Sequence, residues 1–235
     1  MPDGPSAGGG PNSAVMRSSL RQQIADALRD EVLTGRLPAG RHFTVKEIAE
    51  LYGVSATPVR EALVDLAAQG LLDIEHHRGF QVRRFTHDDF LSLIDARTTV
   101  LESAFRRMNA EGVADFPDAA LVSVRRRAAA AARAACSGQL DILIGYDLRF
   151  WREFAALAGN EHICEFLDRI RTQTWVYSVP LLRGQPQLAG MFWSDHVALV
   201  EAVATRDTMT AQRLVDAYNA HTVALMEKLT ADLRP

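Results

Sequence analysis

Cysteine is scarce in this chain of 235 residues, and long apolar runs are missing. The two cysteines, Cys136 and Cys164, have neither metal-ligand spacing nor a partner motif, which favours two reduced thiols. No apolar run is long enough to cross a bilayer. Residues 1–15 lack the basic and apolar regions of a secretory signal. We therefore expect a cytoplasmic protein with no membrane partner.

An excess of positive charge is also missing, because the net charge is −3. A general polyanion binder is basic, so any contact with nucleic acid must come from a local patch. Residues 1–15 are rich in Gly, Pro and Ser, which predicts a disordered tail. The remaining length suffices for two domains. The patterns described below predict one domain over residues 16–85 and a second over residues 86–235.

The first third of the chain has the pattern of two short helices joined by a turn. An earlier helix, starting after Ser19, carries apolar residues at helical spacing. Thr44 and Glu47 have capping-box spacing, which predicts the start of a second helix. Gly53 then turns the chain, and Ser55 is placed to cap a third helix. This order is typical of a helix-turn-helix.

The third helix and the segment after it carry features that suit DNA. First-turn N–H groups can hold a phosphate, and Arg60 can reach a guanine edge in the major groove. Next, Leu72 and Ile74 on one side of a turn, with apolar residues on the other, predict two short strands. We expect a β-hairpin wing whose turn spans His76–Gly79.

The uninterrupted run from LPAG to RGFQV resembles the DNA-binding domain of GntR-family regulators, most specifically in GVSATPVREAL and RGFQV. The resemblance implies operator DNA as a partner. The residues that it assigns to DNA contact are Lys46, Ser55, Thr57, Arg60, His77, Arg78 and Gly79. The family usually has Arg directly after the Ser of this motif, where this chain has Ala56. One base-reading contact, worth roughly 1–3 kcal/mol, is therefore missing, and we expect an unusual half-site or weaker binding.

After Phe85 the pattern is wholly helical, which predicts an all-α bundle of about six helices. The fourth of these is expected to end near residue 178, and the last two to span about 188–205 and 208–231. Bundles of this kind place ligand sites in the core between facing helices. The fold class is therefore mainly α, with a winged helix-turn-helix of three helices and a hairpin, followed by a helical bundle.

Three polar residues stand out on apolar faces of the bundle: Asp147, His196 and His221. Two imidazoles and a carboxylate suit a divalent metal such as zinc or nickel. The alternative is that each is a satisfied structural residue or a surface residue.

Residues 87–231 resemble the ligand-binding domain of the FadR subfamily of GntR regulators, through motifs such as DLRFWREFAALAGN and SDHVALVEAVATRD. The resemblance implies a metal held by one Asp and three His, which helps to hold a small organic acid. Asp147, His196 and His221 match three of these positions, but the first His is replaced by Trp151, whose indole cannot ligate a metal.

Three interpretations of the Trp151 substitution stay open. The metal is held by the other three residues, or the site is metal-free and Trp151 contacts the effector, or the site is vestigial. Arg97 matches a family Arg near the site and can pair with an effector carboxylate. Its alternative is a structural ion pair with Glu102 or another acid.

Together these features predict a homodimeric repressor that binds operator DNA and responds to a small carboxylate effector, and not an enzyme. A metalloenzyme built on Asp147, His196 and His221 is the first alternative, but it leaves the first 85 residues unexplained. The second alternative is a DNA-binding protein without an effector.

Overall fold

The computed structural model describes residues 11–111 and 118–231, and the chain divides into two compact units between Arg84 and Phe85. The division falls within one residue of the expected domain limit. Residues 1–10 of the expected tail lie outside the described residues. Residues 11–15 belong to the first helix, which begins at Pro11 and not near Ser19.

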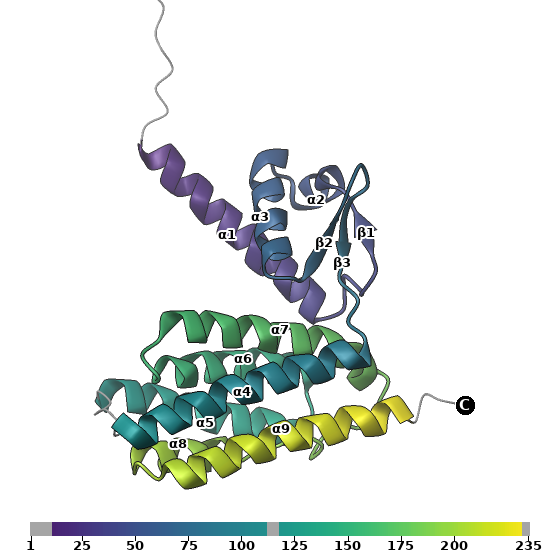
Figure 1. The fold of residues 1–235 in the computed structure, drawn as a ribbon. Helices are drawn as coiled ribbons and strands as arrows, with labels where there is room; N and C mark the ends of the chain where they lie inside the picture. Colours follow the sequence, from purple (N-terminus) through teal and green to yellow (C-terminus); the bar gives the residue numbers. More distant parts are fainter. Residues whose placement is uncertain (1–10, 112–117, 232–235) are drawn as a thin grey trace, which may run out of the picture. The chain divides into compact units, whose positions relative to one another are not determined.

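The first unit is a winged helix-turn-helix, as predicted. Its elements are α1 (Pro11–Leu33), β1 (His42–Phe43), α2 (Val45–Tyr52), α3 (Ala56–Ala68), β2 (Leu72–Glu75) and β3 (Gly79–Val82). The helix α3 packs against α1 and α2 and buries one apolar face, which includes Val59, Leu63 and Leu66. The strands form an antiparallel sheet in the order β1–β3–β2 (Figure 1). The two-residue strand β1 was not predicted, because so short a segment shows no alternation.

The two helix starts of the motif differ in their caps. Thr44 and Glu47 form the predicted capping box, with the Thr44 hydroxyl accepting from Glu47 N and the Glu47 carboxylate accepting from Thr44 N. Ser55 occupies the N-cap position of α3, but its side chain makes no capping hydrogen bond. The turn between them relies on Gly53, which has a φ of 65°.

This difference predicts unequal effects of two matched substitutions. Thr44→Ala is expected to destabilise the first unit by about 1 kcal/mol, because it removes the capping bond of α2. Ser55→Ala is expected to cost only a few tenths of this, roughly 0.3 kcal/mol, because no such bond is lost. Urea unfolding followed by circular dichroism measures both. Equal losses in the two variants would contradict the assignment of the caps.

The second unit is an all-α bundle, again as predicted. Its helices are α4 (His87–Glu111), α5 (Asp118–Ser137), α6 (Leu140–Ala156), α7 (Glu161–Arg183), α8 (His196–Ala204) and α9 (Thr208–Ala231). In order of contact, α4, α7, α6, α5, α8 and α9 form a ring that closes because α9 packs against α4. Figure 1 shows these helices running along a common direction. The centre of the ring is therefore enclosed by helices on every side.

Two helix limits differ from the sequence prediction. The helix α7 does not stop near residue 178 but continues through Pro180 to Arg183. A proline inside a helix costs one backbone hydrogen bond, but its neighbours Val179 and Leu182 are both 1% exposed. Their burial offsets that cost. The helix α8 begins only at His196, eight residues later than expected, so that residue occupies the first turn of its helix.

No helix in the described ranges has both the length and the apolar character that are needed to span a membrane.

Candidate nucleic-acid interface and ligand cavity

The start of α3 presents the features that a phosphate and a base edge require. Because the Ser55 side chain does not cap the helix, no side chain there competes with a phosphate for the first-turn N–H groups. Thr57 and Arg60 are exposed on the first two turns of α3. On α2, Lys46 is also exposed, and its Nζ lies 3.8 Å from a carboxylate oxygen of Glu50. Such an exposed pair is weak, so Lys46 can turn to DNA at little cost.

The wing places its remaining candidates at the tip of a tight hairpin. His77 and Arg78 are exposed there, between β2 and β3. Gly79 has a φ of 97°, and a Cβ at this position would lie 2.5 Å from the Phe43 carbonyl oxygen. Gly79 is therefore required by the backbone of the wing, whether or not it also contacts DNA.

A cavity opens among the helices of the second unit. It is open to solvent, and its volume of about 540 Å³ includes that open mouth. Most of its lining is apolar or aromatic. The lining residues are Leu143, Asp147, Thr174, Trp175, Ser178, Leu182, Phe192, Trp193, His196, Tyr218, His221, Thr222, Leu225 and Met226. The three predicted metal ligands are therefore brought to one cavity.

Asp147 is held by two indoles. Its Oδ1 accepts from Trp151 Nε1 at 3.0 Å, and its Oδ2 accepts from Trp175 Nε1 at 2.8 Å. The two tryptophans come from α6 and α7, so the carboxylate joins neighbouring helices. Trp151, one helical turn after Asp147 on α6, thus takes part in the site as a hydrogen-bond donor to the aspartate. It does not line the cavity, and its predicted contact with an effector stays a prediction.

A buried guanidinium supplies the positive charge beside this carboxylate. Arg171 Nη1 lies 3.7 Å from Asp147 Oδ2 and donates to the Tyr218 hydroxyl at 2.7 Å. Its Cζ lies 4.2 Å from the centroid of the Trp151 ring, within the range of a cation–π contact. Both charged side chains are at most 5% exposed. Arg171 therefore contacts Asp147 without itself lining the cavity.

Arg97 lies deeper in the same cluster. It is 1% exposed, and its Nη2 donates to Asn219 Oδ1 at 2.7 Å. Burial lowers the pKa of its guanidinium to about 10. The hydrogen-bond partner of Arg97 is therefore the amide of Asn219, whereas the structural alternative predicted the carboxylate of Glu102 or of another acid. Arg97 does not line the cavity, so its predicted pairing with an effector carboxylate also stays a prediction.

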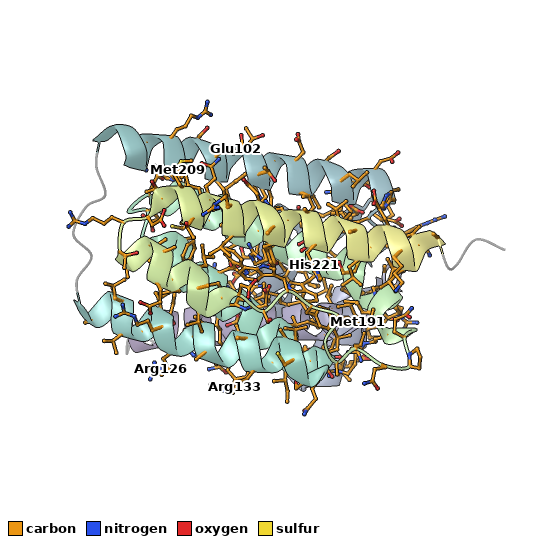
Figure 2. The ribbon with its side chains drawn as sticks, turned by 90° about the horizontal axis from the view of Figure 1, so that it is seen from below. Glu102, Arg126, Arg133, Met191, Met209 and His221 are labelled. Atoms are coloured by element: carbon orange, nitrogen blue, oxygen red, sulfur yellow. The ribbon has the colours of Figure 1, made fainter. Side chains whose placement is uncertain are left out.

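The other two candidate ligands differ in their surroundings. His196 is 1% exposed, and neither of its ring nitrogens has a hydrogen-bond partner within normal geometry. Burial lowers the pKa of its imidazole, whereas the negative charge of Asp147 and the backbone of Ser194 act in the opposite direction. His221 is exposed and its Nε2 lies 2.8 Å from the Met191 carbonyl oxygen. Figure 2 shows His221 on α9, with Met191 in the segment before α8.

These donors do not fit a divalent metal. Both oxygens of Asp147 accept indole N–H groups, and His221 Nε2 is occupied by a carbonyl oxygen. These bonds use only part of the acceptor capacity of the carboxylate, but a metal at Asp147 would have to fit beside two indole donors and the Arg171 guanidinium. Within the described residues, no three His, Cys, Asp or Glu side chains are grouped as a metal site requires.

The comparisons with known families agree with the two units. Residues 20–82 match the family of bacterial regulatory proteins called gntR, and residues 92–221 match the FCD domain. The chain belongs to the GntR family. It thus combines a gntR-type region with an FCD domain, and this family and the relatives described next are transcriptional regulators and not enzymes.

Two of the curated relatives of this chain that are named as repressors match different shares of it. It is 38% identical over 86 residues to a probable D-xylose utilization operon transcriptional repressor of Paenarthrobacter nicotinovorans, covering 37% of this chain and 38% of the relative. It is 24% identical over 199 residues to the HTH-type transcriptional repressor GlaR of Escherichia coli, covering 80% of this chain and 87% of the relative. The chain thus spans well under half the length of the first relative.

Solved structures share the fold. McbR/YncC of E. coli has a TM-score of 0.70 at 20% identity, covering 89% of this chain and 98% of the other. A putative GntR regulator from Rhodococcus sp. RHA1 has a TM-score of 0.69 at 20% identity, covering 92% of this chain and 100% of the other.

The sequence interpretation missed four residues of the site: Trp175, Trp193 and Tyr218, which line the cavity, and Arg171, which pairs with Asp147. One signal was available, because Arg171 and Trp175 stand one helical turn apart and so share a face of α7. Trp193 precedes α8 in irregular structure, where no periodicity predicts which way a side chain points.

Proposed function

We propose that this regulator represses transcription by binding an operator through the winged helix of its first unit, under the control of a small molecule in the cavity. The observation that carries the control by a small molecule is a largely apolar cavity whose wall holds a buried imidazole, His196, without a hydrogen-bond partner among the described residues. Buried polar groups without partners are costly, and a ligand that pairs with them gains that energy.

The DNA-binding half rests on the exposed candidates of α2, α3 and the wing. We propose that two copies of the chain bind a pseudo-palindromic operator, since a symmetric dimer places one winged helix on each half-site. Lys46, Arg78 and the start of α3 then hold the phosphate backbone, and Arg60 reads a base. An operator-binding regulator works where the chromosome is, which places it in the cytoplasm.

We further propose that the cavity works without a metal. The small organic acid that the FadR-type resemblance implies depends on that metal, because the metal supplies the positive charge that meets the carboxylate. With Asp147 committed to two indoles, the cavity lacks that charge.

Elemental analysis of the purified full chain tests the metal-free proposal. We expect zinc and nickel at well below one equivalent, and no rise in melting temperature on adding either metal, because two indoles and a guanidinium already surround Asp147 and the described side chains form no group of three ligands. One full equivalent that survives dialysis would reject the proposal.

A thermal-shift screen of small organic molecules, with and without divalent metals, tests effector control. A compound that binds the native state raises the melting temperature, and each binder is then added to a complex with operator selected from random DNA. We expect at least one binder to change operator affinity by about 5–150-fold, the usual range of allosteric coupling. Binders that all leave operator affinity unchanged would contradict effector control.

A further inference from the structure

Two groups of polar side chains in the cavity wall differ in whether they already have hydrogen-bond partners. In the first group every donor already has a partner. The hydroxyls of Thr174, Ser178 and Thr222 each donate to a backbone carbonyl of their own helix. Their protons are therefore committed, although their lone pairs can still accept.

The second group consists of polar atoms that are buried and have no partner. These are both ring nitrogens of His196 and the indole Nε1 of Trp193. The two rings are neighbours, with centroids 4.7 Å apart at an interplanar angle of 62°. A neutral imidazole has one N–H and one acceptor nitrogen, so together the pair presents two donors and one acceptor in one region of the wall.

Positive charge is missing from this wall. Of the described residues that line the cavity, none is Lys or Arg, and the charged one is the carboxylate of Asp147. The nearby guanidinium of Arg171 is engaged by Asp147, Tyr218 and the Trp151 ring, and it lies outside the lining. Burying a carboxylate where no cation is free to meet it is costly.

We propose that the cavity takes an uncharged, largely apolar molecule that carries a hydroxyl group, placed against Trp193 and His196. A hydroxyl has one donor and two acceptor sites, which complement the unpartnered atoms of this pair. The apolar body packs against the side chains of Trp175, Phe192 and Leu225. The inference rests on the proposed effector control and names the class of molecule that this cavity binds.

The test uses three skeletons, phenyl, cyclohexyl and n-pentyl, each with a methyl, a hydroxymethyl or a carboxylate group. Binding to the full chain is measured by isothermal titration calorimetry, with and without zinc chloride. We expect the best alcohol to bind about 2–10-fold tighter than its hydrocarbon, the gain of a net hydrogen bond. We expect its carboxylate to bind at least about 10-fold weaker than the alcohol, in either medium.

Trp193→Phe isolates the hydrogen bond, because it keeps an aromatic ring and removes the N–H. We expect the preference for alcohol over hydrocarbon to shrink in this variant while the affinity for the hydrocarbon changes little. The control is Tyr177→Phe, which removes the hydroxyl of an aromatic ring that does not line the cavity and that pairs instead with His87 Nδ1 and Thr230 Oγ1. It is expected to keep the preference for the alcohol.

Carboxylates that bind tighter than alcohols, or a panel in which nothing binds, would overturn the inference. A carboxylate that binds only with zinc and also shifts operator affinity would support effector control. It would reject the proposal that the ligand is an uncharged molecule. An alcohol that binds as expected but leaves operator affinity unchanged would support the ligand class and reject effector control.

Discussion

Arg60→Ala is expected to remove most of the discrimination between operator and unrelated DNA while leaving weak, salt-sensitive binding. Arg60 is exposed near the start of α3, and a guanidinium there can make a bidentate contact with guanine worth about 1–3 kcal/mol. Its effect is expected to be large because Ala56 stands where the family usually has another Arg. Phosphate contacts from Lys46 and the wing survive the substitution, so non-specific binding persists.

Fluorescence anisotropy with operator and scrambled duplexes, at fixed salt, measures this ratio of affinities. The matched control is Arg36→Ala, which removes the same charge from an exposed side chain that pairs with Glu31 at 3.0 Å. This control is expected to keep the ratio. An unchanged ratio in Arg60→Ala would reject α3 as the recognition helix.

Asp147→Asn is expected to destabilise the second unit by about 3–5 kcal/mol, because it leaves the buried Arg171 charge uncompensated. An amide also cannot accept from both Trp151 and Trp175, since one of its two ends is a donor. For a chain of this size each kcal/mol corresponds to roughly 2–4 °C in melting temperature. Differential scanning calorimetry of the full chain measures the loss.

Asp141→Asn provides the control from the same helix. Asp141 pairs with Arg183 at the surface, with side chains 57% and 40% exposed, and such pairs contribute no more than about 1 kcal/mol. Equal losses in the two variants would show that Asp147 is not the centre of a buried charge cluster.

The first unit could be predicted almost completely, because its signals are local. Capping residues, turn glycines and apolar spacing act over a few residues, so Thr44, Glu47 and Gly53 mark the helix-turn-helix directly. The exceptions are the start of α1 at Pro11, the two-residue strand β1, and Ser55, whose residue type predicted a cap that its side chain does not make.

The candidate site of the second unit could be predicted only in part. The resemblance to the FadR subfamily grouped Asp147, His196 and His221, and all three line the cavity. Their chemistry depends on partners distant in sequence, such as Trp175 and Arg171 on α7, and periodicity cannot reveal these contacts. Trp151 signalled that the site departs from its family, but only the structure shows it donating to the aspartate.

The link between the cavity and the winged helix is tested most directly by the operator dissociation constant, measured at fixed salt with and without a saturating cavity ligand. The three tryptophans of the chain report occupancy by fluorescence, because Trp175 and Trp193 line the cavity and Trp151 lies behind it. We expect the constant to change by about 5–150-fold once the cavity is filled. An unchanged constant with the cavity demonstrably occupied would contradict control of DNA binding by this site.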